Sequence, residues 1–160
     1  MENKIIGEYL FKRFCWTRTN TIQLFELAQK ANILQYKPKY LIENPTENHD
    51  LLYQFQCVLT STNAHFRRSR NDENIRFAIY VKDGSITKKQ DIKKENILSL
   101  FNEQIEEAKK VIADCLDLKK LLSTFITIGE HEALHQGQLV VMFRETKVEF
   151  PEEFKKAWNL

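Results

Sequence analysis

The stretch that decides the fold reads GEHEALHQGQL and spans residues 129–139. Its two histidines, His131 and His135, are four residues apart, which is about one turn of an α-helix. Side chains at that spacing project in the same direction, so both imidazoles face one point in space. Such a pair is able to share one metal ion, and imidazole suits zinc, nickel, iron and copper. The alternative is two partly buried histidines that are satisfied by hydrogen bonds.

This stretch lies inside a longer helical pattern that runs from residue 118 to residue 146. At 100° per residue, one broad arc of this segment collects the apolar side chains together with both histidines. The arc holds Leu121, Phe125, Ile128, His131, Glu132, His135, Leu139 and Met142. The two imidazoles are therefore predicted to face the interior of a helical protein.

Three further segments show helical periodicity. They cover residues 4–32, a segment that starts near Thr46 and ends in the polar run 67–74, and residues 93–115. Residues 17–21 are poor in helix formers and are expected to kink or split the first segment. The stretch 46–49, which follows Pro45, offers capping residues for the second. A last helical turn is expected within residues 152–160, with Phe154 and Trp158 packing back on the protein.

Residues 75–91 break the helical pattern. Apolar Phe77, Ile79 and Val81 alternate with other side chains, and Asp83-Gly84 is a turn signal. We therefore expect a short strand or an extended crossing loop. Four long amphipathic segments predict an all-α fold, an antiparallel four-helix bundle that forms a single domain over residues 1–160. Residues 75–91 would be the long connection between its second and third helices.

Composition and charge exclude several classes of protein. The formal net charge of +2 is too small to predict a nucleic acid or an anionic membrane as partner. The three cysteines, Cys15, Cys57 and Cys115, are far apart and odd in number, which argues against a disulfide framework. No secretion signal and no apolar run of about 20 residues is present. These features predict a cytoplasmic protein.

The stretch also contains the His-Glu-x-x-His pattern of zinc hydrolases, in which the glutamate acts as general base. Here that glutamate is Glu132. We disfavour this interpretation because no downstream ligand pattern follows. Glu132 is instead expected to contact a histidine from outside the ligand shell. Gln138 is expected to hydrogen-bond a ligand or orient a histidine, and the alternative is an ordinary interhelical amide.

The segment from His131 to Arg144 resembles the fourth-helix signature of the DinB-like (DinB/YfiT) superfamily. The family pattern is His-x-x-x-His-Arg-Gly-Gln-Leu, followed by apolar residues and an arginine. This chain has His131-x-x-x-His135-Gln136-Gly137-Gln138-Leu139 and then Met142-Phe143-Arg144. Elsewhere the resemblance rests on the order of the elements and the overall length. It implies a four-helix bundle with a long second connection, and a homodimer.

The resemblance further implies one divalent transition metal ion, zinc or nickel, held by three histidines. Two come from the fourth helix and one from the second, where the register falls near Gln54. The third ligand is therefore Gln54 or His65, or the site is incomplete. By the same angular count, Cys57 points almost opposite the apolar face of its helix, and we discount it as a ligand.

The function implied by the resemblance is a metal-dependent enzyme of the thiol S-transferase type. Its substrate would be a small molecule or a low-molecular-weight thiol. The sequence identifies no catalytic residue beyond the ligands. The first alternative is a metal-free, non-catalytic bundle that binds a ligand or a protein. A His-Glu-x-x-His zinc hydrolase is the third and least favoured interpretation.

Overall fold

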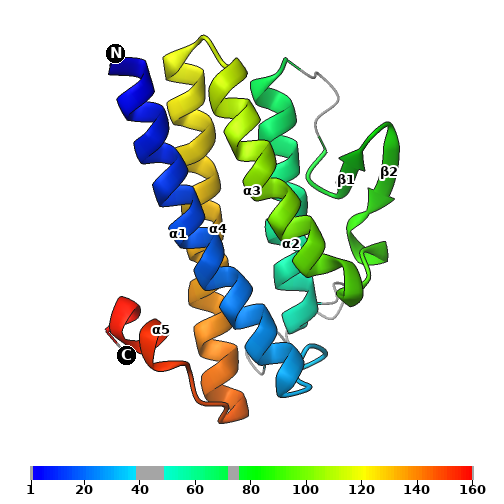
Figure 1. The fold of residues 1–160 in the computed structure, drawn as a ribbon. Coiled ribbons are helices and arrows are strands. Elements are labelled where there is room, and N and C mark those ends of the chain that lie inside the picture. Colours follow the sequence, from blue (N-terminus) through cyan, green and yellow to red (C-terminus); the bar gives the residue numbers. More distant parts are fainter. Residues whose placement is uncertain (1, 39–48, 72–75, 160) are drawn as a thin grey trace.

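The computed structural model of the chain describes residues 2–38, 49–71 and 76–159. Within those ranges it is predominantly helical and holds one small sheet (Figure 1). The α-helices are α1 (Glu2–Lys30), α2 (Leu51–Ser69), α3 (Ile97–Asp114), α4 (Leu118–Thr146) and α5 (Glu152–Trp158). The strands are β1 (Ile79–Lys82) and β2 (Ser85–Lys88), followed by the 3₁₀ turns η2 (Lys89–Asp91) and η3 (Lys94–Asn96). The predicted all-α class agrees broadly with this content.

The four long helices pack side by side, and α4 lies against both α1 and α2. In Figure 1, α1 and α4 run in one direction, whereas α2 and α3 run in the other. Because α2 and α3 are parallel, the chain between them must return along the length of the helices. The long connection expected at this place is present, since α2 ends at Ser69 and α3 begins at Ile97. The assignment to a DinB-like four-helix bundle remains a prediction.

Helix α1 is continuous, so the expected kink at residues 17–21 was wrong. The hydroxyl of Thr17 donates to the carbonyl oxygen of Arg13 at 3.1 Å. The hydroxyl oxygen of Thr21 lies 3.4 Å from the carbonyl oxygen of Thr17, one turn before it. Threonine is tolerated inside a helix when its hydroxyl bonds back to the preceding turn. Tertiary packing of this stretch therefore overrides its weak helix propensity.

The bounds of α2 and α4 follow from their caps. The side chain of Asp50 accepts from the backbone N–H of Tyr53 at 2.8 Å and begins α2. The predicted cap at residues 46–48 lies outside the described residues. Asp117 caps α4 in the same way, and the helix ends before Lys147, which adopts a left-handed conformation with φ of 59°. The predicted bounds of this helix, 118 and 146, are confirmed.

The connection between α2 and α3 carries a β-hairpin. A short strand and a turn at Asp83-Gly84 were expected here, and the second strand was not. Its turn residues Asp83 and Gly84 both have positive φ, 48° and 78°, as a tight hairpin turn requires. The hairpin is fastened to α2 by Asn63, whose Nδ2 donates to the Val81 carbonyl at 3.0 Å. The Val81 N–H donates back to Asn63 Oδ1 at 2.9 Å. This reciprocal pair fixes the position of the connection on the helix.

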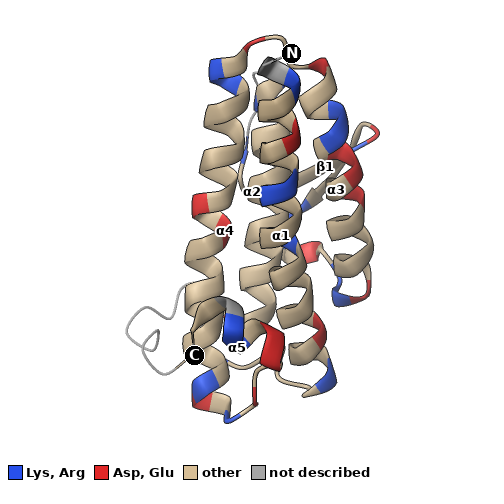
Figure 2. Cartoon of the chain, turned by 60° about the vertical axis from the view of Figure 1, so that its left-hand side comes forward, with Lys and Arg blue, Asp and Glu red and all other residues tan. Residues whose placement is uncertain are grey.

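Apolar side chains of all the long helices form the core between them. The C-terminal turn closes one end, because Phe154 is fully buried and stacks on Phe150 at 5.4 Å and on Trp158 at 5.5 Å. This confirms the expected packing of the tail. In Figure 2, α5 lies in front of the lower part of the helices, and charges of both signs are interspersed along α1 and α3. Among the described residues, no helix has the length and apolarity needed to cross a membrane.

Candidate metal centre

Three potential metal ligands meet where α2 packs against α4. The ligand atoms of Cys57, His131 and His135 all lie within 4.8 Å of one another. The Nε2 atoms of the two histidines are 3.2 Å apart, and Cys57 Sγ lies 3.9 Å from Nε2 of His131. His135 is buried, whereas the other two side chains are half-buried. The predicted histidine pair therefore faces the interior, as expected.

Two of the separations between these atoms are close to those around a small tetrahedral ion. Zinc binds imidazole nitrogen at about 2.0–2.1 Å and thiolate sulfur at about 2.3 Å. Tetrahedral angles then separate two nitrogen ligands by roughly 3.3 Å, and a sulfur from a nitrogen by roughly 3.6 Å. The distances in the protein are 3.2 Å for the nitrogen pair and 3.9 Å for the sulfur–nitrogen pair. One thiolate and two imidazoles are also ligands that zinc prefers.

Gln54 lies beside His135 and contacts the ring nitrogen that faces away from His131. Nδ1 of His135 donates to Oε1 of Gln54 at 2.6 Å. With the proton on Nδ1, the lone pair of the neutral ring lies on Nε2, which faces Nε2 of His131. A hydrogen bond of this kind to the distal nitrogen is the usual support of a metal-bound histidine. The structure therefore gives Gln54 a positioning role at the site where the family register placed a ligand.

Both imidazoles are held in the neutral form that binds metal. Burial, followed by the charge of His131, lowers the pKa of His135 to about 4, and Lys89 acts in the same direction. The nearby Gln138 side chain opposes this lowering of the pKa, because its oxygen favours the charged ring. Burial also lowers the pKa of His131, and the charges of His65 and Lys89 add to the effect. Near pH 7 neither ring carries a proton that a metal must displace.

Gln138 lies on the histidine side of α4, as predicted. Besides its effect on the pKa of His135, its Oε1 atom is buried and meets no donor at full hydrogen-bond geometry among the described residues. Buried side-chain oxygens are normally paired. An acceptor held in this way beside His135 is able to take a hydrogen bond from a bound ligand, which agrees with the expected role.

The expectation that Cys57 points away from the histidines was wrong. Its helix, α2, is buried over most of its circumference, because it packs against α3, α4, β1 and η2. A side chain opposite the main apolar arc therefore still faces protein. Cys57 follows Gln54 by three residues, so both side chains lie on neighbouring positions of one face, towards α4. An angular count that treats one arc of the helix as the interior cannot find such a residue.

His65 does not join the cluster. It lies eight residues beyond Cys57 on α2 and stacks on Phe77, with ring centroids 5.3 Å apart. Burial and the charge of Arg68 lower the pKa of His65. Its charge reaches His131, but its ring nitrogens are not among the ligand atoms that meet there. The structure therefore does not bring His65 to the histidine pair, whereas it does bring Cys57 there.

Lys89 is a residue of this site that sequence reasoning missed. Its Nζ donates to the Tyr53 hydroxyl at 2.8 Å, lies 4.2 Å from the centre of the Tyr53 ring and is 4.0 Å from Cys57 Sγ. Lys89 begins η2, directly after the hairpin, where the sequence offers only a polar run. The sequence does not distinguish Lys89 from its polar neighbours, because the packing of the connection on α2 decides which lysine faces inwards.

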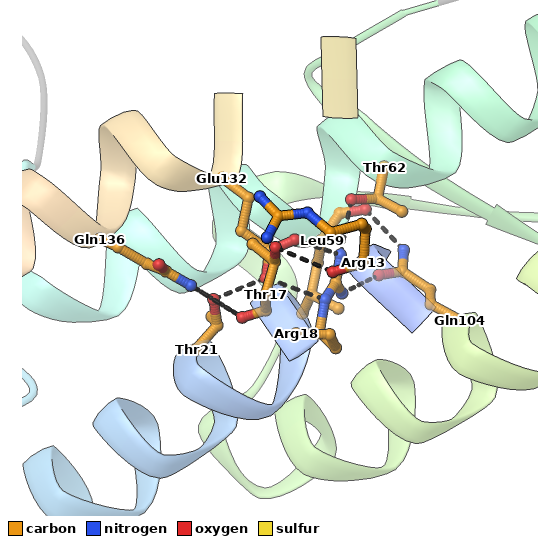
Figure 3. Close-up of polar contacts among 9 residues, drawn as sticks. All are labelled: Arg13, Thr17, Arg18, Thr21, Leu59, Thr62, Gln104, Glu132 and Gln136. Atoms are coloured by element: carbon orange, nitrogen blue, oxygen red, sulfur yellow. Dashed lines mark hydrogen bonds and ion pairs between the residues drawn. The ribbon is translucent and has the colours of Figure 1, made fainter. Parts of the chain in front are cut away.

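Glu132 does not contact either histidine. Its carboxylate forms a buried ion pair with Arg18 of α1, with Nε and Oε1 3.0 Å apart and both side chains almost fully buried. It also accepts from the Thr21 hydroxyl at 2.5 Å (Figure 3). Position 132 is turned by 100° from position 131, which directs it towards α1 instead of α2. Its expected contact with a histidine is corrected, and the zinc-hydrolase interpretation loses its general base.

Arg18 and Glu132 are the centre of a polar layer that joins all four long helices (Figure 3). Arg18 also donates to Gln104 of α3 at 2.5 Å and to Thr62 of α2 at 2.8 Å. Gln136 of α4 donates to the Thr17 carbonyl and to the Thr21 hydroxyl, both at 2.8 Å. The guanidinium lies over the rings of Phe14 and Phe101. We call this group the closed polar layer, since its charges are paired within the protein.

Comparisons with known proteins give no assignment for this chain. No protein-family profile, no curated protein and no solved structure matches it. The functional argument therefore rests on the residues of the site and on the sequence resemblance of α4.

Proposed function

We propose that this chain is a DinB-like four-helix bundle that binds one divalent transition ion, zinc in the first place, through Cys57, His131 and His135. The observation that carries the proposal is the convergence of three ligand atoms within 4.8 Å from two helices. Supporting it, Gln54 orients one imidazole, and burial keeps both rings neutral. Three protein ligands leave one coordination position for another molecule, which is typical of catalytic zinc sites.

The activity we propose is transfer chemistry on a small thiol or a related nucleophile. An ion in this site would act as a Lewis acid and lower the pKa of a coordinated thiol or water. The residues of the chain hold the ion, orient His135 and keep part of the site away from solvent. The thiol substrate and the homodimer are expectations from the resemblance, and the cytoplasmic location is an expectation from the sequence features alone.

The experiment that tests the proposal is metal analysis of protein purified without an affinity tag or chelator. We expect about one transition ion per chain in the wild type, and loss of that ion in Cys57→Ala, His131→Ala and His135→Ala. Cys115→Ala is a matched control, because it removes a half-buried thiol that is remote from the histidines. Loading with cobalt adds a second readout, since a thiolate ligand gives an intense near-ultraviolet band. That band should disappear in Cys57→Ala and persist in Cys115→Ala.

Wild-type protein that takes up no zinc, nickel or cobalt when these are offered in excess would reject the proposal. The two histidines would then be a hydrogen-bonded pair, which their 3.2 Å separation also allows. Metal uptake that survives Cys57→Ala but not His131→Ala would keep a metal site and reject Cys57 as its ligand.

The alternative of a metal-free binding module is favoured by one separate observation. A cavity of about 730 Å³ lies between α1 and α4 on the other side of α4. It is mainly apolar, and Phe14, Trp16 and Trp158 line it together with the polar groups of Arg13 and Glu130. Cavities of this size and character bind small molecules. A shift of the Trp16 or Trp158 fluorescence by an apolar dye, lost in an Ala133→Trp variant that fills the cavity, would support this function.

A further inference from the structure

Lys89 places a positive charge directly beside the candidate metal centre. Its Nζ is 4.0 Å from Cys57 Sγ and 2.8 Å from the Tyr53 hydroxyl. Its backbone is fixed, because the Lys89 N–H donates to the Ala78 carbonyl at 2.8 Å.

The charges at this site do not balance without a further anion. A divalent ion, the Cys57 thiolate and the Lys89 ammonium sum to +2, since the two histidines are neutral. Among the described residues no carboxylate contacts Lys89, and Glu132 is paired with Arg18 on the other side of α4. A partly buried positive site attracts small anions, because the interaction is weakly screened there.

Hydrogen-bond donors are also left over at this place. An ammonium group has three N–H donors, and one of those of Lys89 is used by the Tyr53 hydroxyl oxygen while a second faces Cys57 Sγ. The third remains for a ligand. Tyr53 accepts through its oxygen, so its own O–H also remains available. Two donors therefore lie on the Cys57 side of the cluster.

We propose that the site binds a small anion, with one donor atom on the metal ion and its negative charge against Lys89 Nζ and the Tyr53 O–H. This inference rests on the proposed metal centre and narrows its ligands to carboxylates and thiolates. Lys89 is then a specificity-determining residue, because it favours a charged ligand over a neutral one of the same size.

The test uses the cobalt-loaded full-length protein, whose visible absorption changes when a ligand occupies the open position. Acetate and 2-mercaptoethanol are titrated separately at pH 7.5, and imidazole serves as a neutral probe. The informative variant is Lys89→Gln. Its matched control is Lys88→Gln, which removes the same charge from an exposed side chain one residue away.

We expect Lys89→Gln to weaken acetate binding about tenfold, as loss of a charge-assisted hydrogen bond predicts. Lys88→Gln should change it less than about twofold, and imidazole binding should stay the same in all three proteins. A similar loss for 2-mercaptoethanol would show that a coordinated thiolate is recognised by the same charge. A loss confined to acetate would show that the site selects carboxylates.

Equal acetate affinity in cobalt-loaded wild type and Lys89→Gln would overturn the anion site and leave the metal centre standing. If Lys89→Gln loads no cobalt, Tyr53→Phe replaces it, because this variant removes one donor without removing a charge. We then expect acetate binding to weaken about threefold. Unchanged acetate affinity in Tyr53→Phe would overturn the inference. Wild-type protein that binds no cobalt would reject both proposals together.

Discussion

Two polar clusters share the same two turns of α4 and differ in how far the protein satisfies them. In the closed polar layer, Arg18 and Glu132 are 0% and 1% exposed, and each is paired or hydrogen-bonded to several partners. In the candidate metal centre, three atoms with lone pairs face one another, and Gln54 supports just one of them from behind. Charges that are paired within the protein stabilise the fold, whereas lone pairs that converge on one point are suited to bind a cation.

The largest effect is expected from breaking the closed polar layer. Arg18→Met leaves the Glu132 carboxylate buried without its partner, which should lower the free energy of unfolding by about 3–5 kcal/mol. Urea unfolding followed by circular dichroism measures this. The double variant Arg18→Met/Glu132→Leu should lose less than the sum of the two single variants, because it leaves no buried charge. A loss below about 1 kcal/mol in Arg18→Met would contradict a stabilising pair.

At the candidate metal centre, a substitution is expected to weaken zinc binding strongly and to change the stability of the fold little. Cys57→Ala should weaken zinc binding at least about a hundredfold, because it removes one of three ligands. The same change should alter the unfolding free energy of the metal-free protein by no more than about 1 kcal/mol. Competition with a chromophoric chelator gives the affinity. If Arg18→Met lost zinc as strongly as Cys57→Ala while still folded, the two clusters would not be separable in the way we describe.

The pH dependence of the free energy of unfolding should report on His135 of the candidate metal centre. In the folded, metal-free protein the pKa of His135 is about 4, below the ordinary value of 6.5. Between these values the unfolded chain binds more protons, so the free energy of unfolding should rise as the pH rises from about 4 to 6.5 and level off above that. The rise should be on the order of 2–3 kcal/mol. Urea midpoints across this range measure it, and an identical slope in His135→Gln would exclude His135 as its source.

The smallest effect on zinc binding is expected from replacing Gln54, which contacts Nδ1 of His135. Gln54→Leu removes the acceptor for Nδ1–H of His135 and should weaken zinc binding about tenfold. Gln54→Glu keeps an acceptor at the same place and should bind zinc nearly as the wild type does. The same chelator competition compares all three. Equal weakening in both variants would indicate that packing at position 54, and not the hydrogen bond, supports the site.

Much of the helical pattern could be predicted from the sequence, and the limits of that prediction have physical causes. The bounds of α4 and the inward direction of both histidines follow from local periodicity and from the caps. The first strand and the turn of the hairpin follow from alternating residues and an Asp-Gly pair. Such features depend on neighbours within a few positions, so they are visible in the chain itself.

The residues that sequence reasoning misplaced all depend on which helix lies opposite. Cys57 is a candidate ligand because α4 and η2 cover the side of α2 that its apolar arc does not define. Glu132 of α4 pairs with Arg18 of α1, because α4 packs against a different helix on each side. A signal for the second case existed: the polar stretches 17–21 and 132–136 both interrupt otherwise apolar helix faces, and such stretches tend to meet.

The hairpin connection has a consequence for how this architecture could change its chemistry. Asn63 holds the connection on α2 through Val81, while the three candidate metal ligands all come from the helices. The side chain presented at position 89 is therefore independent of the ligand set. Exchange of this connection for another of similar length would change the side chain at position 89. The charge preference of the site would then change, while the helices and the candidate ligands stay in place.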